Sequence, residues 1–469
     1  MACCNASNGP GYATPALAVG GPRERLLYVT CARYSSAHPD VLATVDVDPT
    51  SETYGTVIHK LELTHAGDEI HHSGWNACSS CFGNSSVCRS HIVLPCLNTS
   101  RIYIADVVTD PKAPRWQRVI EPWEVHERDV SFGHTSHCLA DGNVMISTLG
   151  DKHGNAKGSF LQLDSKTFNV KGTWGDRAVS YGYDYWYQPF HNVMISTSWG
   201  SPNLIKKGFN LEDVQNGKYG HELYVWNWKQ QKLVDTLKLD PVKGCMPLEV
   251  RFQHNPKSIH GFVGCALGST IYHIWRNEDT GRWQADCVVE IPTRNVRNWA
   301  LPEMPALITD ILISMDDRFL YVSTWLHGDL LQYDISDPFH PKLTGTVKIG
   351  GSIQGNVTYP NGEQPKPTVV KGRKVDGGTQ MLQLSLDGKR MYVTNSLYTV
   401  WDQQFYPDLV KNGASLVLVD CDTVNGGMSL NQGLNVNFND AKGALMAHEM
   451  RYPGGDCSSD IFLADTAKL

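Results

Sequence analysis

A repeated pattern of short antiparallel strands is the feature of this sequence that most restricts its fold. Its clearest copy has four strand-like runs joined by tight turns, at 308–314, 319–325, 330–335 and 342–349. The same order recurs from His134 and from Thr379, each time with an Asp-Gly turn after the first run. With weaker copies included, seven units begin near residues 72, 134, 183, 248, 309, 379 and 448.

Four-stranded units at this spacing are typical of β-propeller blades, because a lone sheet cannot bury both faces and must stack on its neighbours. The pattern therefore predicts an all-β, seven-bladed β-propeller that spans residues 1–469 as a single domain. The last unit, from His448, is too short to form a whole blade. The strand-like segments 26–31 and 41–47 near the N-terminus belong to none of the seven units. We expect strands from the two ends of the chain to share one blade, which closes the ring and removes free sheet edges.

Three stretches carry more residues than a blade needs and are expected to be loop insertions, near 68–101, 204–220 and 350–374. Residues 463–469 form a C-terminal tail beyond the last unit.

Charge and hydropathy exclude two classes of partner. The chain has 41 Lys and Arg against 48 Asp and Glu without blocks of like sign, which argues against nucleic acid. It has no run of about 18 apolar residues, so no stable membrane insertion is expected. The first ten residues lack the apolar core of a secretory signal, which favours a cytoplasmic location.

The 13 cysteines are an odd number in a chain without an export signal, so most are expected to be reduced thiols. Cys78 and Cys81 have the C-x-x-C spacing of half a zinc site, but Cys88 and Cys96 lie too far apart to supply the other half. Metal or dithiol chemistry at Cys78 and Cys81 stays open as a secondary hypothesis. Cys457 and the pair Cys3-Cys4 are interpreted as accessible thiols.

In a propeller the first strand of each blade lines the central channel, so the residues that open these strands converge at one mouth. Aligning the seven units brings together two kinds of side chain, histidines and carboxylates, with one amide: His71 or His72, His134 with His137, Asp184, Glu249, Asp310, Gln380, and His448 with Glu449. The turn between the second and third strands opens on the same side, which places His327 near the rim.

Each of these histidines alone could simply bond to a neighbouring backbone group, but several at equivalent positions of one ring favour a metal site. Residues three apart on a strand point to opposite sides, so only one of His134 and His137 can face the channel. We favour His134, with His137 packed between blades or supporting a ligand. Imidazole ligands suit copper or zinc better than calcium. The predicted ligands are His72, His134, His327 and His448, with His71 and His137 as alternates or supporting residues.

Long strings spread over residues 9–462 resemble the selenium-binding protein family. The strings include His71-His-Ser-Gly-Trp75, Cys78-Ser-Ser-Cys-Phe82, His134-Thr-Ser-His-Cys138, Trp325-Leu-His-Gly-Asp329 and Arg451-Tyr-Pro-Gly-Gly-Asp-Cys-Ser-Ser-Asp460. The resemblance implies a seven-bladed propeller and copper-dependent methanethiol oxidase activity, in which methanethiol, oxygen and water give formaldehyde, hydrogen sulfide and hydrogen peroxide. It also implies that the histidines at 71, 72, 134, 137, 327 and 448 belong to copper-associated motifs.

Two features of the chain differ from the family pattern. Vertebrate members carry a cysteine proposed to hold selenium where this chain has Gly55, so selenium attachment by that route is not available here. The last residues, Ala467-Lys468-Leu469, are close to the Ser-Lys-Leu peroxisomal address, which makes the peroxisome an alternative to the cytoplasm.

In the mechanism that we expect, copper binds the substrate as a thiolate, and one of Glu249, Asp310 and Glu449 takes a proton during removal of a methyl hydrogen. The choice among these three stays open. A non-enzymatic thiol- or selenium-binding propeller scaffold is the main alternative, and it requires exposed reactive cysteines. A hydrolase with a calcium-type carboxylate site is a third hypothesis, against which the histidine content counts.

Overall fold

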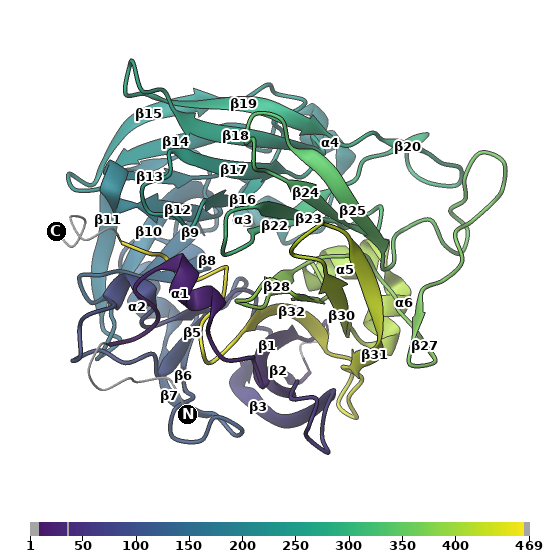
Figure 1. Cartoon of the computed structure of the whole chain (residues 1–469), viewed down its shortest axis with the longest axis horizontal. Helices are drawn as coiled ribbons and strands as arrows, with labels where there is room; N and C mark the ends of the chain where they lie inside the picture. Colours follow the sequence, from purple (N-terminus) through teal and green to yellow (C-terminus); the bar gives the residue numbers. More distant parts are fainter. Residues whose placement is uncertain (1–8, 35–36, 464–469) are drawn as a thin grey trace.

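Seven four-stranded antiparallel sheets surround a central axis in the computed structural model, which describes residues 9–34 and 37–463 (Figure 1). This architecture confirms the predicted seven-bladed β-propeller. Each predicted start lies inside the innermost strand of a blade or within three residues of it. The alignment of the units is therefore correct at every blade.

Six blades are formed by strands that follow one another in the chain, with the first strand innermost. They are β4 (Gly74–Trp75), β5 (His91–Pro95), β6 (Ile102–Asp106), β7 (Arg115–Ile120); β8 (Ser131–Cys138), β9 (Asn143–Gly150), β10 (Ala156–Asp164), β11 (Val170–Val179); β12 (Tyr185–Gln188), β13 (Val193–Ser196), β14 (Glu222–Asn227), β15 (Lys232–Lys238); β16 (Pro247–Phe252), β17 (His260–Cys265), β18 (Thr270–Arg276), β19 (Trp283–Glu290); β22 (Ile308–Ile313), β23 (Phe319–Thr324), β24 (Asp329–Asp334), β25 (Lys342–Lys348); and β28 (Leu382–Leu384), β29 (Arg390–Val393), β30 (Ser415–Cys421), β31 (Met428–Asn437).

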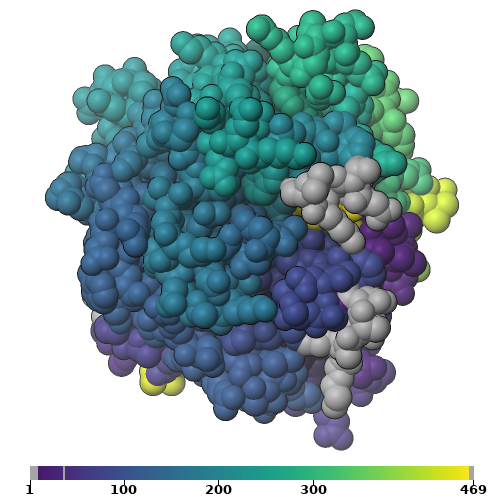
Figure 2. Space-filling view, turned by 90° about the vertical axis from the view of Figure 1, so that its left-hand side faces the viewer, coloured from purple at the N-terminus to yellow at the C-terminus, as the bar shows by residue number. Residues whose placement is uncertain are grey.

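The seventh blade joins the two ends of the described chain, as expected. Its inner strand is β32 (Met446–Arg451), followed outward by β1 (Leu26–Ala32), β2 (Pro39–Asp46) and β3 (Thr56–Ala66). β32 and β1 pair antiparallel, with Val29 opposite Met450. In the side view, teal and green segments from the middle of the chain lie above blue and purple segments from its first third (Figure 2). The pairing leaves the ring without an open edge at this junction.

Turn chemistry explains why the strands within a blade are so short and regular. In the turn after β28, the Ser385 hydroxyl donates to Asp387 Oδ1 (2.6 Å) and the Gly388 N–H donates to the Ser385 carbonyl (2.9 Å). Gly388 has φ +73°, a value that glycine adopts at little cost. The turn after β22 repeats the arrangement with Ser314 and with Asp317 at φ +61°. These Asp-Gly and Asp-Asp signals therefore set the hairpin register.

Apolar residues fill the space between neighbouring blades. Between the blades that begin with β4 and β8, a cluster of buried side chains includes Val93, Ile104, Val144, Ile146 and Leu161. β8 and β9 are covered on both faces, so every residue of these two strands is buried and burial does not alternate along them.

Short helices, 3-10 turns and two-stranded ribbons lie outside the blade strands. They are α1 (Pro15–Val19), α2 (Pro122–His126), α3 (Pro202–Ile205), α4 (Leu211–Gln215), α5 (Thr399–Phe405), α6 (Pro407–Asn412), the 3-10 turns η1 (Ser79–Cys81) and η2 (Pro189–His191), and the two-stranded ribbons β20 (Arg294–Asn295) with β21 (Glu303–Met304) and β26 (Val369–Val370) with β27 (Arg373–Lys374). None of the helices in the described part of the chain is long and apolar enough to cross a membrane.

Two of these helices, from different blades, pack together. The buried indole of Trp401 in α5 donates its N–H to the carbonyl of Ile205 in α3, at 3.0 Å. The same ring stands edge-on to Trp199, with centroids 5.8 Å apart. Tyr398, directly before α5, lies edge-on to His71. The α3–α5 pair therefore belongs to the surroundings of the histidines at the channel mouth.

Candidate metal centre

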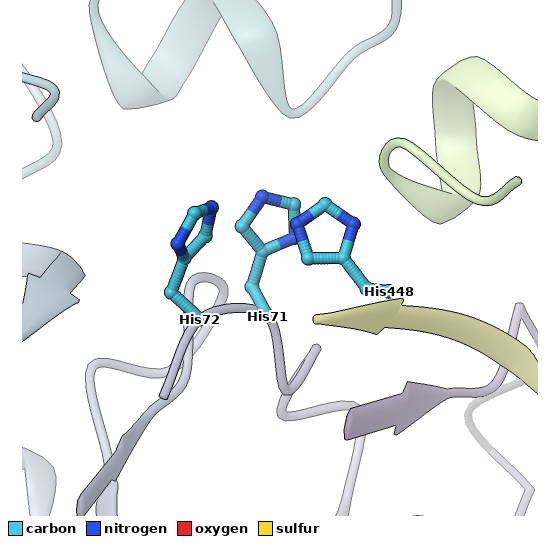
Figure 3. Close-up of side chains that lie close together, drawn as sticks. All are labelled: His71, His72 and His448. Carbon is cyan, nitrogen blue, oxygen red and sulfur yellow. The ribbon is translucent and has the colours of Figure 1, made fainter. Parts of the chain in front are cut away.

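Three buried histidines meet where two blades open at the channel mouth. His71 and His72 lie just before β4, and His448 lies in β32, so the closing blade places residues nearly 380 positions apart side by side (Figure 3). One ring nitrogen of each lies within 4.8 Å of the others. The His71 and His448 rings are stacked, with centroids 3.6 Å apart. This spacing suits three imidazoles around one metal ion.

His134, from β8, stands next to this group. Its ring centroid is 3.9 Å from that of His72 and 5.3 Å from that of His71, while its other neighbour is the ring of Tyr183 at 3.9 Å. His134 is fully buried. We refer to His71, His72, His134 and His448 as the histidine cluster.

Three members of the cluster are held through Nδ1. His448 Nδ1 donates to the carbonyl of Ser396 at 2.8 Å, and His134 Nδ1 lies 3.1 Å from Thr135 Oγ1. His72 Nδ1 lies 3.1 Å from Glu449 Oε1. A ligating histidine normally uses its second nitrogen in this way, which fixes the ring orientation and the tautomer.

The opposite nitrogen of the same three rings is buried and has no partner. The Nε2 atoms of His72, His134 and His448 form no hydrogen bond with any residue of 9–34 or 37–463. An unsatisfied buried nitrogen costs about 1–3 kcal/mol, so three at one place need an explanation. Since Nδ1 of His448 donates to a carbonyl, its Nε2 carries the lone pair that a metal requires. The residues present therefore fit a metal ion.

The surroundings keep the cluster uncharged. Burial lowers the pKa of His448 to about 3. Burial, followed by the neighbouring imidazoles, lowers the pKa of His71 and of His134 well below the ordinary range, and burial with Arg451 and Arg251 does so for His72. Neutral imidazoles are the form that binds metals, so no proton has to be displaced near neutral pH.

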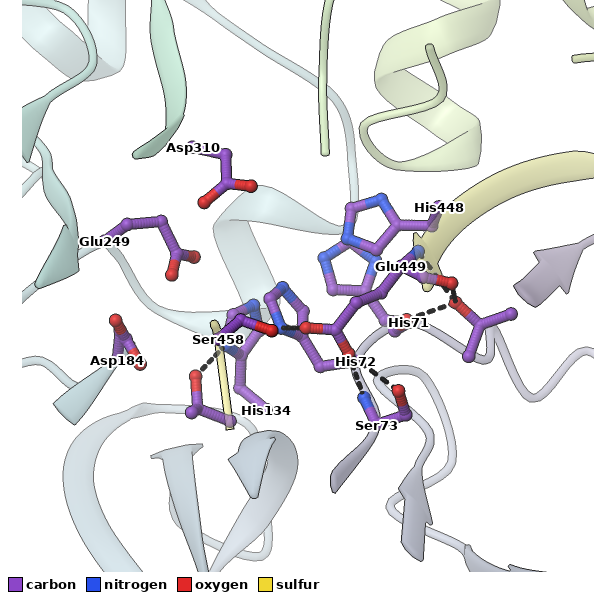
Figure 4. A network of polar contacts seen from close by, with 12 residues as sticks. His71, His72, Ser73, His134, Asp184, Glu249, Asp310, His448, Glu449 and Ser458 are labelled. Atoms are coloured by element: carbon purple, nitrogen blue, oxygen red, sulfur yellow. Dashed lines mark hydrogen bonds and ion pairs between the residues drawn. The ribbon is translucent and has the colours of Figure 1, made fainter. Parts of the chain in front are cut away.

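Glu449 connects the cluster to an arginine. Its Oε1 accepts a hydrogen bond from Arg451 (2.6 Å), and its Oε2 accepts from the hydroxyl (2.8 Å) and the N–H of Ser73 (Figure 4). All of these partners are donors, so the carboxylate acts as an acceptor toward His72 Nδ1 as well. Glu449 thereby orients His72.

A second group of acidic side chains faces the same part of the channel (Figure 4). Arg251 donates to Asp184 Oδ2 and to Glu249 Oε2, both at 2.7 Å, and lies 3.7 Å from Asp310 Oδ1. Burial raises the pKa of Glu249 well above the ordinary range and that of Asp310 to about 7. Each of the three carboxyl groups keeps one oxygen without a hydrogen-bond partner. Glu249 and Asp310, whose pKa values burial raises, are therefore candidates for proton transfer.

The structure changes the set of histidines expected from the sequence. His71, expected as an alternate, lies in the centre of the cluster. His327 Nε2 instead donates to the carbonyl of Met304 at 3.1 Å, and burial lowers its pKa to about 4. His137 projects away from the cluster, with its ring edge-on to Tyr185 and Trp186. The structure therefore does not bring His327 or His137 into the group of three.

Sequence reasoning missed the two arginines. Arg251 and Arg451 each follow a channel glutamate by two residues, as Glu249-Val-Arg251 and Glu449-Met-Arg451. The repeated Glu-x-Arg string at equivalent positions of two inner strands is a signal that could have found them. Residues i and i+2 share one face of a strand, which lets each arginine reach its glutamate.

The cysteines are less accessible than expected. Of the ten that the structure shows as free thiols, eight are buried and two are partly buried. The expectation that Cys457 is accessible is wrong, because the residue is 1% exposed in an apolar cluster with Leu384 and Phe462. The pair Cys3-Cys4 and the tripeptide Ala467-Lys468-Leu469 lie outside the described residues.

Comparisons with known proteins agree on one family. The model of a family described as 56 kDa selenium binding protein matches residues 6–463. A Homo sapiens protein named methanethiol oxidase is 55% identical over 467 residues, covering 97% of this chain and 98% of the relative. A Xenopus tropicalis protein of the same name is 53% identical over 475 residues, covering 99% and 100%.

Solved structures give the same result. A protein from Sulfolobus tokodaii described as a hypothetical selenium-binding protein is 37% identical, has a TM-score of 0.86, and covers 96% of this chain and 98% of its own. A periplasmic gluconolactonase from Pseudomonas aeruginosa has a TM-score of 0.57 at 10% identity, covering 91% and 98%, and shares the fold alone.

Proposed function

The chain belongs to the 56 kDa selenium-binding protein family, and from this membership together with the histidine cluster we propose that it is a methanethiol oxidase with copper as its metal. The reaction converts methanethiol, oxygen and water to formaldehyde, hydrogen sulfide and hydrogen peroxide. The observation that carries the proposal is the set of three buried, partnerless Nε2 atoms at the channel mouth. Relatives named methanethiol oxidase support the choice of substrate.

Copper is chosen over calcium because the donors are imidazole nitrogens. Bound there, copper would supply a soft centre that takes up a thiolate and exchanges electrons with oxygen. The proposed ligands are His71, His72 and His448, with His134 next to them as a fourth imidazole.

The chain's own groups orient the ligands and manage protons. Glu449 fixes His72 and the Ser396 carbonyl fixes His448, each through Nδ1. The reaction releases protons from the thiol and from the methyl group. Glu249 and Asp310, whose carboxyl pKa values are raised by burial, are suited to taking them near neutral pH. Glu449 is already engaged by Arg451, Ser73 and His72, so we favour Glu249 or Asp310 as the base.

The environment also limits the substrate to a small molecule. All four histidines are buried, and Tyr398 stands 6.3 Å from His71 on the segment that leads into α5. Glu69, two residues before His71, accepts hydrogen bonds from the N–H (3.0 Å) and the hydroxyl (2.6 Å) of Thr399 at the start of α5. The start of α5, next to the histidine cluster, is therefore hydrogen-bonded to the segment that carries His71 and His72.

The proposal is tested by product analysis of the copper-loaded protein. Methanethiol in air should yield formaldehyde, sulfide and peroxide in equal amounts, and Glu249→Gln and Asp310→Asn should be compared for kcat at unchanged copper content. A large fall in kcat for one of them identifies the base. Copper-loaded protein that consumes no methanethiol would refute the activity.

A further inference from the structure

A second cluster of reactive groups lies at the other end of the strands that carry the histidines. Cys78 directly precedes η1, which follows β4, Cys81 is the last residue of η1, and Cys138 is the last residue of β8. The Ser80 hydroxyl oxygen is 3.3 Å from the sulfur of Cys78, 3.8 Å from that of Cys138 and 3.9 Å from that of Cys81. Three thiols thus surround one hydroxyl group, and all of them are buried.

The thiols are not equivalent. Burial, followed by the neighbouring thiols of Cys78 and Cys81, raises the pKa of Cys138 well above the ordinary range. The neighbouring Cys138 thiol is the main cause that lowers the pKa of Cys81 to about 7. A nucleophilic thiol beside a protonated one is the arrangement of a dithiol in which one sulfur attacks and the other resolves.

The surroundings hold Cys81 in place next to a residue that lines a cavity. The N–H and hydroxyl of Ser79 both donate to Asp460 Oδ1, at 2.8 and 2.6 Å, which fixes η1. Cys81 Sγ is 3.6 Å from the carbonyl of Leu139. Leu139 lines a cavity of about 350 Å³ together with Tyr187, Trp174 and Trp228. Leu139 therefore contacts both the Cys81 sulfur and a cavity large enough for a peroxide molecule.

We propose that Cys81 and Cys138 form a peroxide-reactive dithiol that closes to a disulfide. The Cys81 thiolate attacks a peroxide oxygen, the O–O bond breaks, and Cys81 becomes a sulfenic acid while the other oxygen leaves as hydroxide and is protonated to water. The Cys138 sulfur then attacks the Cys81 sulfur, an S–S bond forms, and the sulfenic oxygen leaves with the Cys138 proton as a second water. In total, two thiols and hydrogen peroxide give one disulfide and two waters.

The position of the pair gives the crosslink a structural consequence. η1 follows the segment that carries His71 and His72, and Cys138 lies on the strand that carries His134. The disulfide therefore ties together the two elements that supply three members of the histidine cluster. The inference goes beyond the proposed oxidase activity, because peroxide added from outside tests it without methanethiol or copper.

The experiment uses the full-length protein treated with equimolar hydrogen peroxide, quenched with catalase, alkylated in denaturant and mapped by mass spectrometry. We expect a Cys81–Cys138 linked peptide, and loss of the Cys81 thiol about tenfold faster than loss of the buried thiol of Cys265. Cys138→Ser should accumulate a Cys81 sulfenic acid that dimedone traps, whereas Cys78→Ser, the matched control, should still form the linked pair.

Two results would overturn the inference. One is a wild-type protein in which Cys81 and Cys138 both remain alkylatable after peroxide treatment. The other is a Cys78–Cys81 linkage in place of the Cys81–Cys138 linkage. Both are read from the wild-type chain, so they do not depend on whether a variant folds.

Discussion

Replacement of Glu449 by glutamine should weaken metal binding without removing a ligand. The carboxylate lies 3.1 Å from His72 Nδ1 and accepts hydrogen bonds from Arg451 at 2.6 Å and from the Ser73 hydroxyl at 2.8 Å. An amide has nearly the same shape, but it loses the negative charge and turns one acceptor into a donor that faces other donors. Loss of such a supporting carboxylate costs about 10–100-fold in metal affinity, or about 1.4–2.7 kcal/mol.

Glu249→Gln is a matched control for this change. Glu249 occupies the equivalent Glu-x-Arg position of another blade and accepts from Arg251 at 2.7 Å, but among the described residues it forms no hydrogen bond or ion pair with a histidine of the cluster. Glutamine keeps the shape of this side chain and can still accept from Arg251 through its amide oxygen, and the change removes no support from a histidine ligand. We expect its metal affinity to stay within a factor of about three of the wild type.

Copper affinity is measured by titrating each metal-free protein against a chelator of known affinity, with circular dichroism as a check on folding. The reasoning is refuted if Glu449→Gln binds copper as tightly as the wild type. It is also refuted if Glu249→Gln loses as much affinity as Glu449→Gln, since the effect would then come from general loss of charge in the channel.

Two further predictions concern stability. Burial raises the pKa of Asp402 to about 7, above the range of an unfolded aspartate, so the native state retains a proton that the unfolded chain releases. The stability from this proton is present below about pH 4 and is lost as the pH rises through 7, with a slope of up to about 1.4 kcal/mol per pH unit. The fall in unfolding free energy between pH 5 and 7, measured with urea, should therefore be smaller in Asp402→Asn than in the wild type. Gly74→Ala should destabilise the protein by about 3 kcal/mol, because an added Cβ would lie 2.2 Å from the carbonyl oxygen of Ser136 in the neighbouring blade. Gly454→Ala is the control, since nothing lies within 4 Å of its added Cβ, and equal melting temperatures of the two variants would contradict the packing argument.

The fold could be predicted from the sequence because each blade is a local unit. The Asp-Gly and Asp-Asp turns and the apolar runs between them define hairpins without reference to the rest of the chain. Closure of the ring could be predicted by counting strands. The segment from His448 is too short for a blade, and the N-terminal strands belong to no other blade, so the two together complete one. The α3–α5 contact between Ile205 and Trp401 could not be predicted, because it joins insertions of different blades that have no pattern in common.

The site could be predicted only in part. The alignment correctly brought histidines and carboxylates to one mouth, because the first strand of every blade has the same position relative to the axis. The alignment could not decide between His71 and His72. Both enter the cluster because they lie just before β4, outside the strand, so the alternation of side chains along a strand does not apply to them. His327 was placed near the rim from its turn, but the direction of its side chain depends on the Met304 carbonyl of a ribbon that the repeat does not contain.

Metal content is the most direct test of the central claim, that the histidine cluster holds copper. We expect the purified protein to contain about one copper ion per chain, as expected for one cluster of imidazole ligands, and we expect His448→Ala and His72→Ala to lose it. His327→Ala should retain the metal because its ring nitrogen is bonded to Met304. Full copper occupancy in both His448→Ala and His72→Ala, or loss of copper only in His327→Ala, would contradict the account.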